Sequence, residues 1–128
     1  MSEKKGLMTN LDFAKQMQAR TKSFALRVTK MFQRLPKTDE ARVLGKQVLR
    51  SGTSVAANYR AACRSKSRAD FISKLGTTVE EADETLLWLE LLEESGIVPA
   101  KQLESIKAET DELLRVLSTS LDTAKRAR

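Results

Sequence analysis

The sequence predicts an all-α protein, an up-down antiparallel four-helix bundle that forms a single domain over residues 1–128. A chain of 128 residues suits one domain with one hydrophobic core. Only 5% of the residues are aromatic, and there are just 5 Gly and 2 Pro, too few for the strands and turns of an all-β fold. Apolar residues recur every three or four positions in four segments, which is the spacing of amphipathic helices.

Start and stop signals place the four helices at about residues 10–35, 39–64, 67–95 and 99–125. Pro36 ends the first helix, Gly96 follows the third, and Pro99 suits the first turn of the fourth. The residues that can cap the helix N-termini are Asn10, Thr38 or Asp39, and Ser65 or Ser67. Because the connections are short, we expect each helix to be an antiparallel neighbour of the next.

The same spacing predicts which residues of each helix face the core. In the third helix, the predicted stripe is Ile72, Leu75, Val79, Ala82, Leu86 and Leu89. In the other helices it consists of Ala14, Met17, Thr21, Phe24, Val28, Met31 and Leu35; of Leu44, Val48, Val55, Tyr59 and Ala62; and of Leu103, Ile106, Leu113, Leu117, Leu121 and Ala124.

The run Ser51-Gly52-Thr53-Ser54 places poor helix formers in the middle of the second helix. The apolar spacing continues across this run. Continuity favours a helix that packs closely against a neighbour, with a bend, over a true loop.

The third helix carries more apolar surface than one bundle needs. At about 100° per residue, Leu87, Trp88 and Leu91 point away from the core stripe. Apolar residues on more than one side of a helix indicate a second covered face. The pattern therefore predicts a subunit interface that includes these three residues. The alternative is that Trp88 and Leu91 pack under loops or terminal segments of the same chain.

Two residue counts exclude whole classes of site. The chain has no histidine, which excludes His-based acid–base catalysis, Ser-His-Asp and Cys-His triads and His-ligated metals. Cys63 is the only cysteine; Arg60 and Arg64 can lower its pKa, but without a general base it is interpreted as a packed helical residue. The acidic run Glu80–Glu84 is interpreted as a solvated or arginine-paired face. We therefore expect no catalytic residues, no cofactor and no metal.

No membrane or export signal is found in the sequence. Residues 1–8 lack the apolar core of a signal peptide, and no segment reaches the ~18 apolar residues of a membrane helix. A lone thiol without an export signal indicates a cytoplasmic protein.

The net charge of +6 is unevenly distributed along the chain. Residues 1–68 contain 16 Lys and Arg against 4 Asp and Glu, a net +12, whereas residues 69–128 contain 7 against 13, a net −6. On a continuous helix, six basic residues fall within an arc of about 80°, opposite the apolar stripe: Arg42, Lys46, Arg50, Arg60, Arg64 and Arg68. Lys30 and Arg34 on the polar side of the first helix extend this basic face.

A basic face with few acids has two interpretations. It can bind the phosphates of RNA or DNA with little reading of sequence. Alternatively, its cations pair with Asp and Glu of the third and fourth helices, in the same chain or in a neighbouring one. The residues alone support both.

Three ordered stretches resemble the bacterial four helix bundle protein family, of the type encoded in intervening sequences of 23S ribosomal RNA genes. They run from Gln47 to Arg64, from Ser67 to Gly76 and from Glu80 to Leu92, and the resemblance covers roughly residues 24–98. It implies a ring-like homopentamer without catalytic residues. It also implies kinship with the accessory variability protein of diversity-generating retroelements, a basic pentamer that engages nucleic acid and a reverse transcriptase.

Taken together, these features predict a non-enzymatic homo-oligomer, a pentamer by resemblance, that binds RNA or DNA through the basic face of its first and second helices. The alternative is a protein-interaction scaffold. In that case, the basic face docks an acidic protein partner, such as a reverse transcriptase, or the protein's own subunits.

Overall fold

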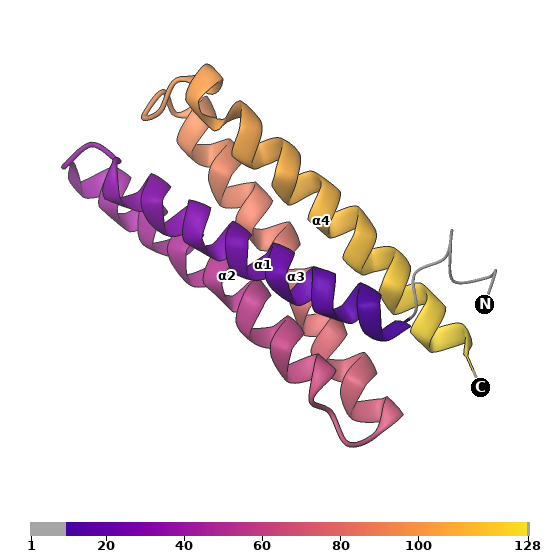
Figure 1. The fold of residues 1–128 in the computed structure, drawn as a ribbon. Helices are drawn as coiled ribbons and strands as arrows, with labels where there is room; N and C mark the ends of the chain where they lie inside the picture. The colour runs from indigo at the N-terminus through magenta and orange to yellow at the C-terminus, as the bar shows by residue number, and fades with distance from the viewer. Residues whose placement is uncertain (1–9, 128) are drawn as a thin grey trace.

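A computed structural model describes residues 10–127 of the chain. It consists of four helices, α1 (Asn10–Gln33), α2 (Asp39–Cys63), α3 (Arg68–Glu94) and α4 (Ala100–Arg126), and the described residues contain no strand. Figure 1 shows an up-down bundle in which the α1–α2 and α3–α4 connections lie at the same end. The predicted all-α four-helix bundle is confirmed.

The helix boundaries follow the capping signals of the sequence. Thr38 and Ser67 each accept a hydrogen bond from a backbone N–H three residues on, at 3.2 and 3.1 Å. Gly96, with a φ of 81°, ends α3 in a conformation that favours glycine. Two details differ from the prediction. Asn10 is already helical, so the cap of α1 falls outside the described residues, and Pro99 is the N-cap of α4 rather than part of its first turn.

Helix α2 is continuous through residues 51–54, which excludes a loop there. Gly52 is buried against Val28 of α1: a Cβ atom added to it would lie 2.9 and 3.0 Å from the two methyl carbons of Val28. The absence of a side chain at Gly52 is therefore what lets α1 approach the backbone of α2. The predicted close packing is confirmed.

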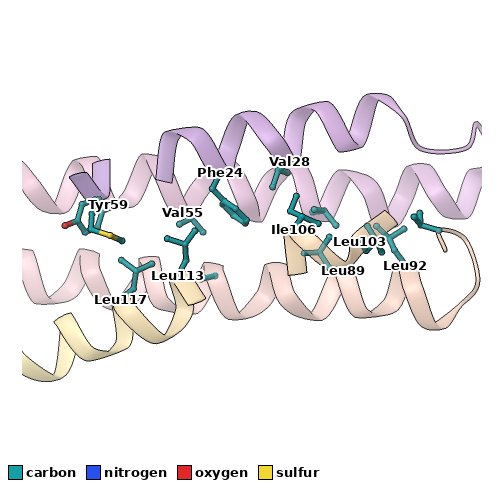
Figure 2. Packing of buried hydrophobic residues seen from close by; sticks show 14 of the residues in the cluster. Phe24, Val28, Val55, Tyr59, Leu89, Leu92, Leu103, Ile106, Leu113 and Leu117 are labelled. Carbon is teal, nitrogen blue, oxygen red and sulfur yellow. The ribbon is translucent and has the colours of Figure 1, made fainter. Parts of the chain in front are cut away.

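The hydrophobic core runs the length of the bundle, and all four helices contribute to it (Figure 2). In Figure 2, Tyr59 and Leu117 lie toward one end of the labelled cluster and Leu92 lies toward the other, with Phe24 and Val28 between them. Almost all of these side chains are inaccessible to solvent. Burial of this apolar surface is the main force that holds the helices together.

The buried stripe of α3 differs from the predicted one. Ile72, Val79 and Leu86 are only partly buried. The buried residues of α3 are Leu75, Thr78, Ala82, Thr85, Leu89 and Leu92. The prediction includes Leu75, Ala82 and Leu89 but misses Thr78 and Thr85, because a pattern of apolar residues does not count threonine.

Five hydroxyl side chains are completely buried, on all four helices: Thr21, Ser51, Thr78, Thr85 and Thr110. Each hydroxyl contacts the backbone carbonyl oxygen four residues earlier, at 2.6–2.9 Å. These local hydrogen bonds satisfy the hydroxyls, so burying them carries little penalty. In addition, the hydroxyl oxygens of Ser51 and Thr85 lie 2.8 Å apart and join α2 to α3.

Helices α1 and α4 approach each other least closely of the four neighbouring pairs. Polar side chains bridge this wider seam. The guanidinium of Arg20 donates two hydrogen bonds of 2.9 Å to Glu109 and a third bond to Glu112, and Arg27 donates to the hydroxyl of Ser105. The pair of carboxylates raises the pKa of Arg20, so this contact stays charged.

Two helical glycines with different surroundings test the close packing of α1 on α2. Alanine is the better helix former by about 1 kcal/mol, so Gly76→Ala, where an added Cβ meets open space, should stabilise the protein by about that amount. In Gly52→Ala, the same gain is outweighed by overpacking against the stiff Val28 side chain, at about 1–3 kcal/mol. Urea unfolding midpoints should therefore move in opposite directions. A stabilised Gly52→Ala variant would contradict the tight contact.

Candidate nucleic-acid interface

Four of the predicted basic residues are exposed and, among the described residues, form no hydrogen bond or ion pair with another helix: Arg42, Lys46 and Arg60 on α2, and Arg64 at its C-cap. Arg42 makes a loose 3.7 Å contact with Asp39, which is almost fully exposed. Within residues 10–127, Lys46, Arg60 and Arg64 form no ion pair. Because α2 is continuous through Arg60, Arg42, Lys46 and Arg60 keep the common orientation that the sequence predicted, and they are open to an external anion.

Two shallow hollows lie between α1 and α2, and none of the described residues that line them is acidic. The first, the Phe32 hollow, has a volume of about 310 Å³ and is lined by Phe32, Gln33, Leu35, Pro36, Lys37, Arg42 and Lys46. The second, the Gln18 hollow, has a volume of about 350 Å³ and is lined by Gln18, Lys22, Thr53, Ala56, Ala57 and Arg60. We call their five cations the basic seam: Lys22, Lys37, Arg42, Lys46 and Arg60.

The other predicted cations of α1 face a different part of the molecule. Lys30 and Arg34, with Arg27, line a groove of about 630 Å³ between α1 and the start of α4. The floor of this α1/α4 groove is aliphatic and includes Leu35 and Ile106. The structure thus does not bring Lys30 and Arg34 onto the basic seam.

Arg50 takes part in the contact between α2 and α3. Its guanidinium lies 3.3 Å from Glu81 and also pairs with Glu84. The same Glu84 carboxylate accepts a 2.9 Å hydrogen bond from the indole N–H of Trp88. Arg50 is still 47% exposed, but it is held by acids of its own chain, so the arginine-paired interpretation of the acidic run holds for Glu81 and Glu84.

Arg68 does not lie on the arc predicted for α2. The chain turns at residues 64–67, so Arg68 is the first residue of α3. It donates hydrogen bonds to the backbone carbonyls of Ala124 and Lys125, at 2.8 and 3.3 Å. A cation at the end of α4 is favourable, because the last carbonyls of a helix carry partial negative charge.

The predicted interface residues of α3 differ in exposure. Leu87 and Leu91 are 48% and 37% exposed, which is high for leucine in a folded domain. Trp88 is partly buried and packs against the core of its own chain while it donates to Glu84. Of the three, Leu87 and Leu91 therefore present the open apolar surface.

The structure contradicts one expectation about Cys63. Burial raises the pKa of its thiol, so the effect suggested for Arg60 and Arg64 does not prevail. Burial also raises the pKa of Tyr59, one turn earlier. Among the described residues, no group of His, Cys, Asp and Glu side chains has the arrangement of a metal site, and no helix is long and apolar enough to cross a membrane.

The family described as 23S rRNA-intervening sequence protein matches residues 14–119. The chain belongs to this family. This membership confirms the resemblance seen in the sequence. The crystal structure of a Bacteroides thetaiotaomicron member of the S23 ribosomal protein family, a protein with unknown function, is also similar. The two sequences are 37% identical, the match covers 85% of this chain and 97% of that one, and the TM-score is 0.79. No curated protein matches the chain.

Sequence patterns missed the residues that shape the two hollows. Phe32 and Gln18 lie beside the apolar stripe of α1, and Lys37 lies in the turn after it. A signal was present in the small residues of α2, Gly45 and Gly52, because small residues predict close approach of a neighbouring helix. Which side of α2 that neighbour takes depends on how the helices are arranged in space.

The raised pKa values of Tyr59 and Cys63 predict how stability depends on pH. In the unfolded chain, the thiol and the phenol lose their protons at about pH 8.5 and 10. In the folded protein, both groups keep their protons to higher pH. The unfolded state then binds fewer protons, so the free energy of unfolding should fall as pH rises through this range. Urea unfolding at about pH 8 and about pH 10.5 measures the slope. The double variant Tyr59→Phe, Cys63→Ala should reduce it, and an unchanged slope would contradict the assignment.

Proposed function

We propose that this protein is a non-enzymatic, cytoplasmic oligomer that binds RNA or DNA phosphates through the basic face of α1 and α2. The proposed residues on this face are Arg42, Lys46, Arg60 and Arg64. The others proposed lie beyond it: Arg50 and Arg68, which are held by contacts within the chain, and Lys30 and Arg34, which line the α1/α4 groove. The observation that supports it most is that none of the described residues lining the Phe32 hollow and the Gln18 hollow is acidic. A solvated helix surface normally mixes charges of both signs, because opposite charges one turn apart stabilise it.

The ion pairs of the chain support the same conclusion. If the basic face served only to neutralise α3 and α4, most of its cations would contact their acids. Of the eight proposed residues, only Arg50 pairs with an acid of another helix within residues 10–127. Exposed cations held close together repel one another, and a bound polyanion removes that repulsion.

We also propose that Leu87, Trp88 and Leu91 belong to a subunit interface. Leu87 and Leu91 are one turn apart on α3 and stay exposed in the single chain. A paired apolar surface of this kind marks a contact with another protein surface. The resemblance of the sequence favours a homopentamer, for which the chain mass of 14.3 kDa requires a particle of about 72 kDa.

A second candidate function is docking of an acidic protein partner, and the α1/α4 groove favours it. Its aliphatic floor suits apolar side chains, and its rim carries Arg27, Lys30 and Arg34. An amphipathic acidic helix fits a surface of this chemistry. Such a partner, a reverse transcriptase among them, would remain bound after nuclease treatment, whereas a nucleic-acid-mediated complex would not.

Charge reversal tests nucleic-acid binding. The triple variant Arg42→Glu, Lys46→Glu, Arg64→Glu should abolish binding of a structured RNA measured by fluorescence anisotropy, with the helical circular dichroism signal unchanged. The wild-type affinity should fall with salt at a log–log slope of about −5 to −9, as for six to ten neutralised phosphates.

A control on α4 separates local binding from net charge. Lys101→Glu, Arg115→Glu, Lys125→Glu also changes the charge by −6 but lies away from the basic seam. It should weaken binding only modestly. Equal losses in both triple variants, or wild-type binding that is absent or insensitive to salt, would overturn the proposal.

Light scattering tests the subunit interface. Leu87→Glu, Leu91→Glu places charges on exposed positions without opening the core, so it should shift the wild-type oligomer toward the mass of one chain. Trp88→Glu should do the same but also removes a packed side chain. Val43→Glu, at a similarly exposed position on α2, is the control and should leave the mass unchanged. A wild-type protein that is already monomeric refutes the interface.

A further inference from the structure

The Phe32 hollow lies at the α1–α2 turn, at the end of the bundle shown with the α3–α4 connection in Figure 1. Its aromatic ring is held against the backbone of α2. A Cβ atom added to Gly45 would lie 3.1 and 3.3 Å from two ring carbons of Phe32. Two carbons of the ring therefore lie against the backbone of α2, while part of the side chain remains accessible.

The chemistry around the ring matches the parts of a nucleotide. Lys37, Arg42 and Lys46 supply three positive charges, which suit a phosphate. Gln33, whose amide is exposed, has both a donor and an acceptor for the edge of a base. An aromatic ring beside such a basic groove is the feature on which unpaired bases stack.

We propose that the Phe32 hollow binds one unpaired nucleotide of an RNA or DNA strand. The base stacks on Phe32, its edge contacts Gln33, and the adjacent phosphates contact Lys37, Arg42 and Lys46. The inference rests on the proposed nucleic-acid binding and goes beyond it, since phosphate contacts alone do not distinguish single from double strands. Bases inside a duplex are already stacked on one another, so the hollow selects single-stranded or looped segments.

The neighbouring α1/α4 groove shows why a nucleotide, rather than an acidic peptide, fits this hollow. That groove is twice as large, and its apolar floor is aliphatic. The Phe32 hollow is smaller, at about 310 Å³, and its largest apolar group is a flat ring. A flat, small site with several cations suits one base and its phosphates better than the bulky apolar side chains of a helix.

The test compares two fluorescein-labelled RNAs by anisotropy: an oligouridylate of about 12 nucleotides and a blunt duplex of similar length. Phe32→Leu keeps an apolar side chain against Gly45 but removes the aromatic face. It should weaken binding of the oligouridylate about tenfold and leave duplex binding within about twofold. Phe13→Leu, another partly buried phenylalanine of α1 outside the hollow, is the matched control and should affect neither RNA.

The outcomes separate this inference from the function on which it rests. If the wild type binds both RNAs and Phe32→Leu changes neither, or both equally, phosphate binding stands and the nucleotide site is overturned. If the wild type binds neither RNA, both are overturned. If polyglutamate displaces the oligouridylate and its own binding falls in Phe32→Leu, the ligand of the hollow is an acidic polypeptide and the inference is wrong.

Photocrosslinking tests the site in the wild-type protein, without any substitution. An oligouridylate carrying 5-iodouracil reacts with an aromatic side chain on which it stacks. After trypsin digestion of the wild-type protein, the adduct should be found on the peptide of residues 31–34, which contains Phe32. Adducts confined to other peptides would overturn the assignment.

Discussion

The close contact of α1 with α2 is the constraint on which the rest of the molecule depends. Gly52 receives the side chain of Val28, and Gly45 receives Leu35 and Phe32, so at these two points α1 packs directly on the backbone of α2. Arg42 and Lys46 of α2, with Lys37 of the α1–α2 turn, line the hollow beside this contact. The packing that joins the first two helices thus also shapes the candidate binding surface.

The acids of the second half of the chain are used on other sides of the bundle. Glu109 and Glu112 hold Arg20 across the seam between α1 and α4, and Glu81 and Glu84 hold Arg50 between α2 and α3. Lys107 of α4 pairs with Glu93 of α3. These contacts leave the basic seam without an acid of α3 or α4 among the described residues, and its one acidic contact is the loose one between Arg42 and Asp39. The split into a +12 half and a −6 half is therefore only partly neutralised by folding.

The fold was predictable from the sequence because the helix signals are local: two hydroxyl caps, Gly96 and the apolar spacing all act within a few residues. The predicted stripe of α3 was right at Leu75, Ala82 and Leu89, but it missed Thr78 and Thr85, which are buried with their hydroxyls satisfied by the preceding turn. The orientation of the α2 cations was predictable for the same local reason. The positions of Arg50 and Arg68 depend on partners that are distant in sequence, and no helical periodicity contains that information.

The weak contact between α1 and α4 has a consequence for how the chain folds. The three extensive helix contacts, α1 with α2, α2 with α3 and α3 with α4, all join neighbours in the sequence. Proteins whose native contacts are mostly local have low contact order and fold in microseconds to milliseconds. The α1–α4 contact, which joins the helices most distant in sequence, is the least extensive, so we expect the chain to fold fast through contacts between successive helices.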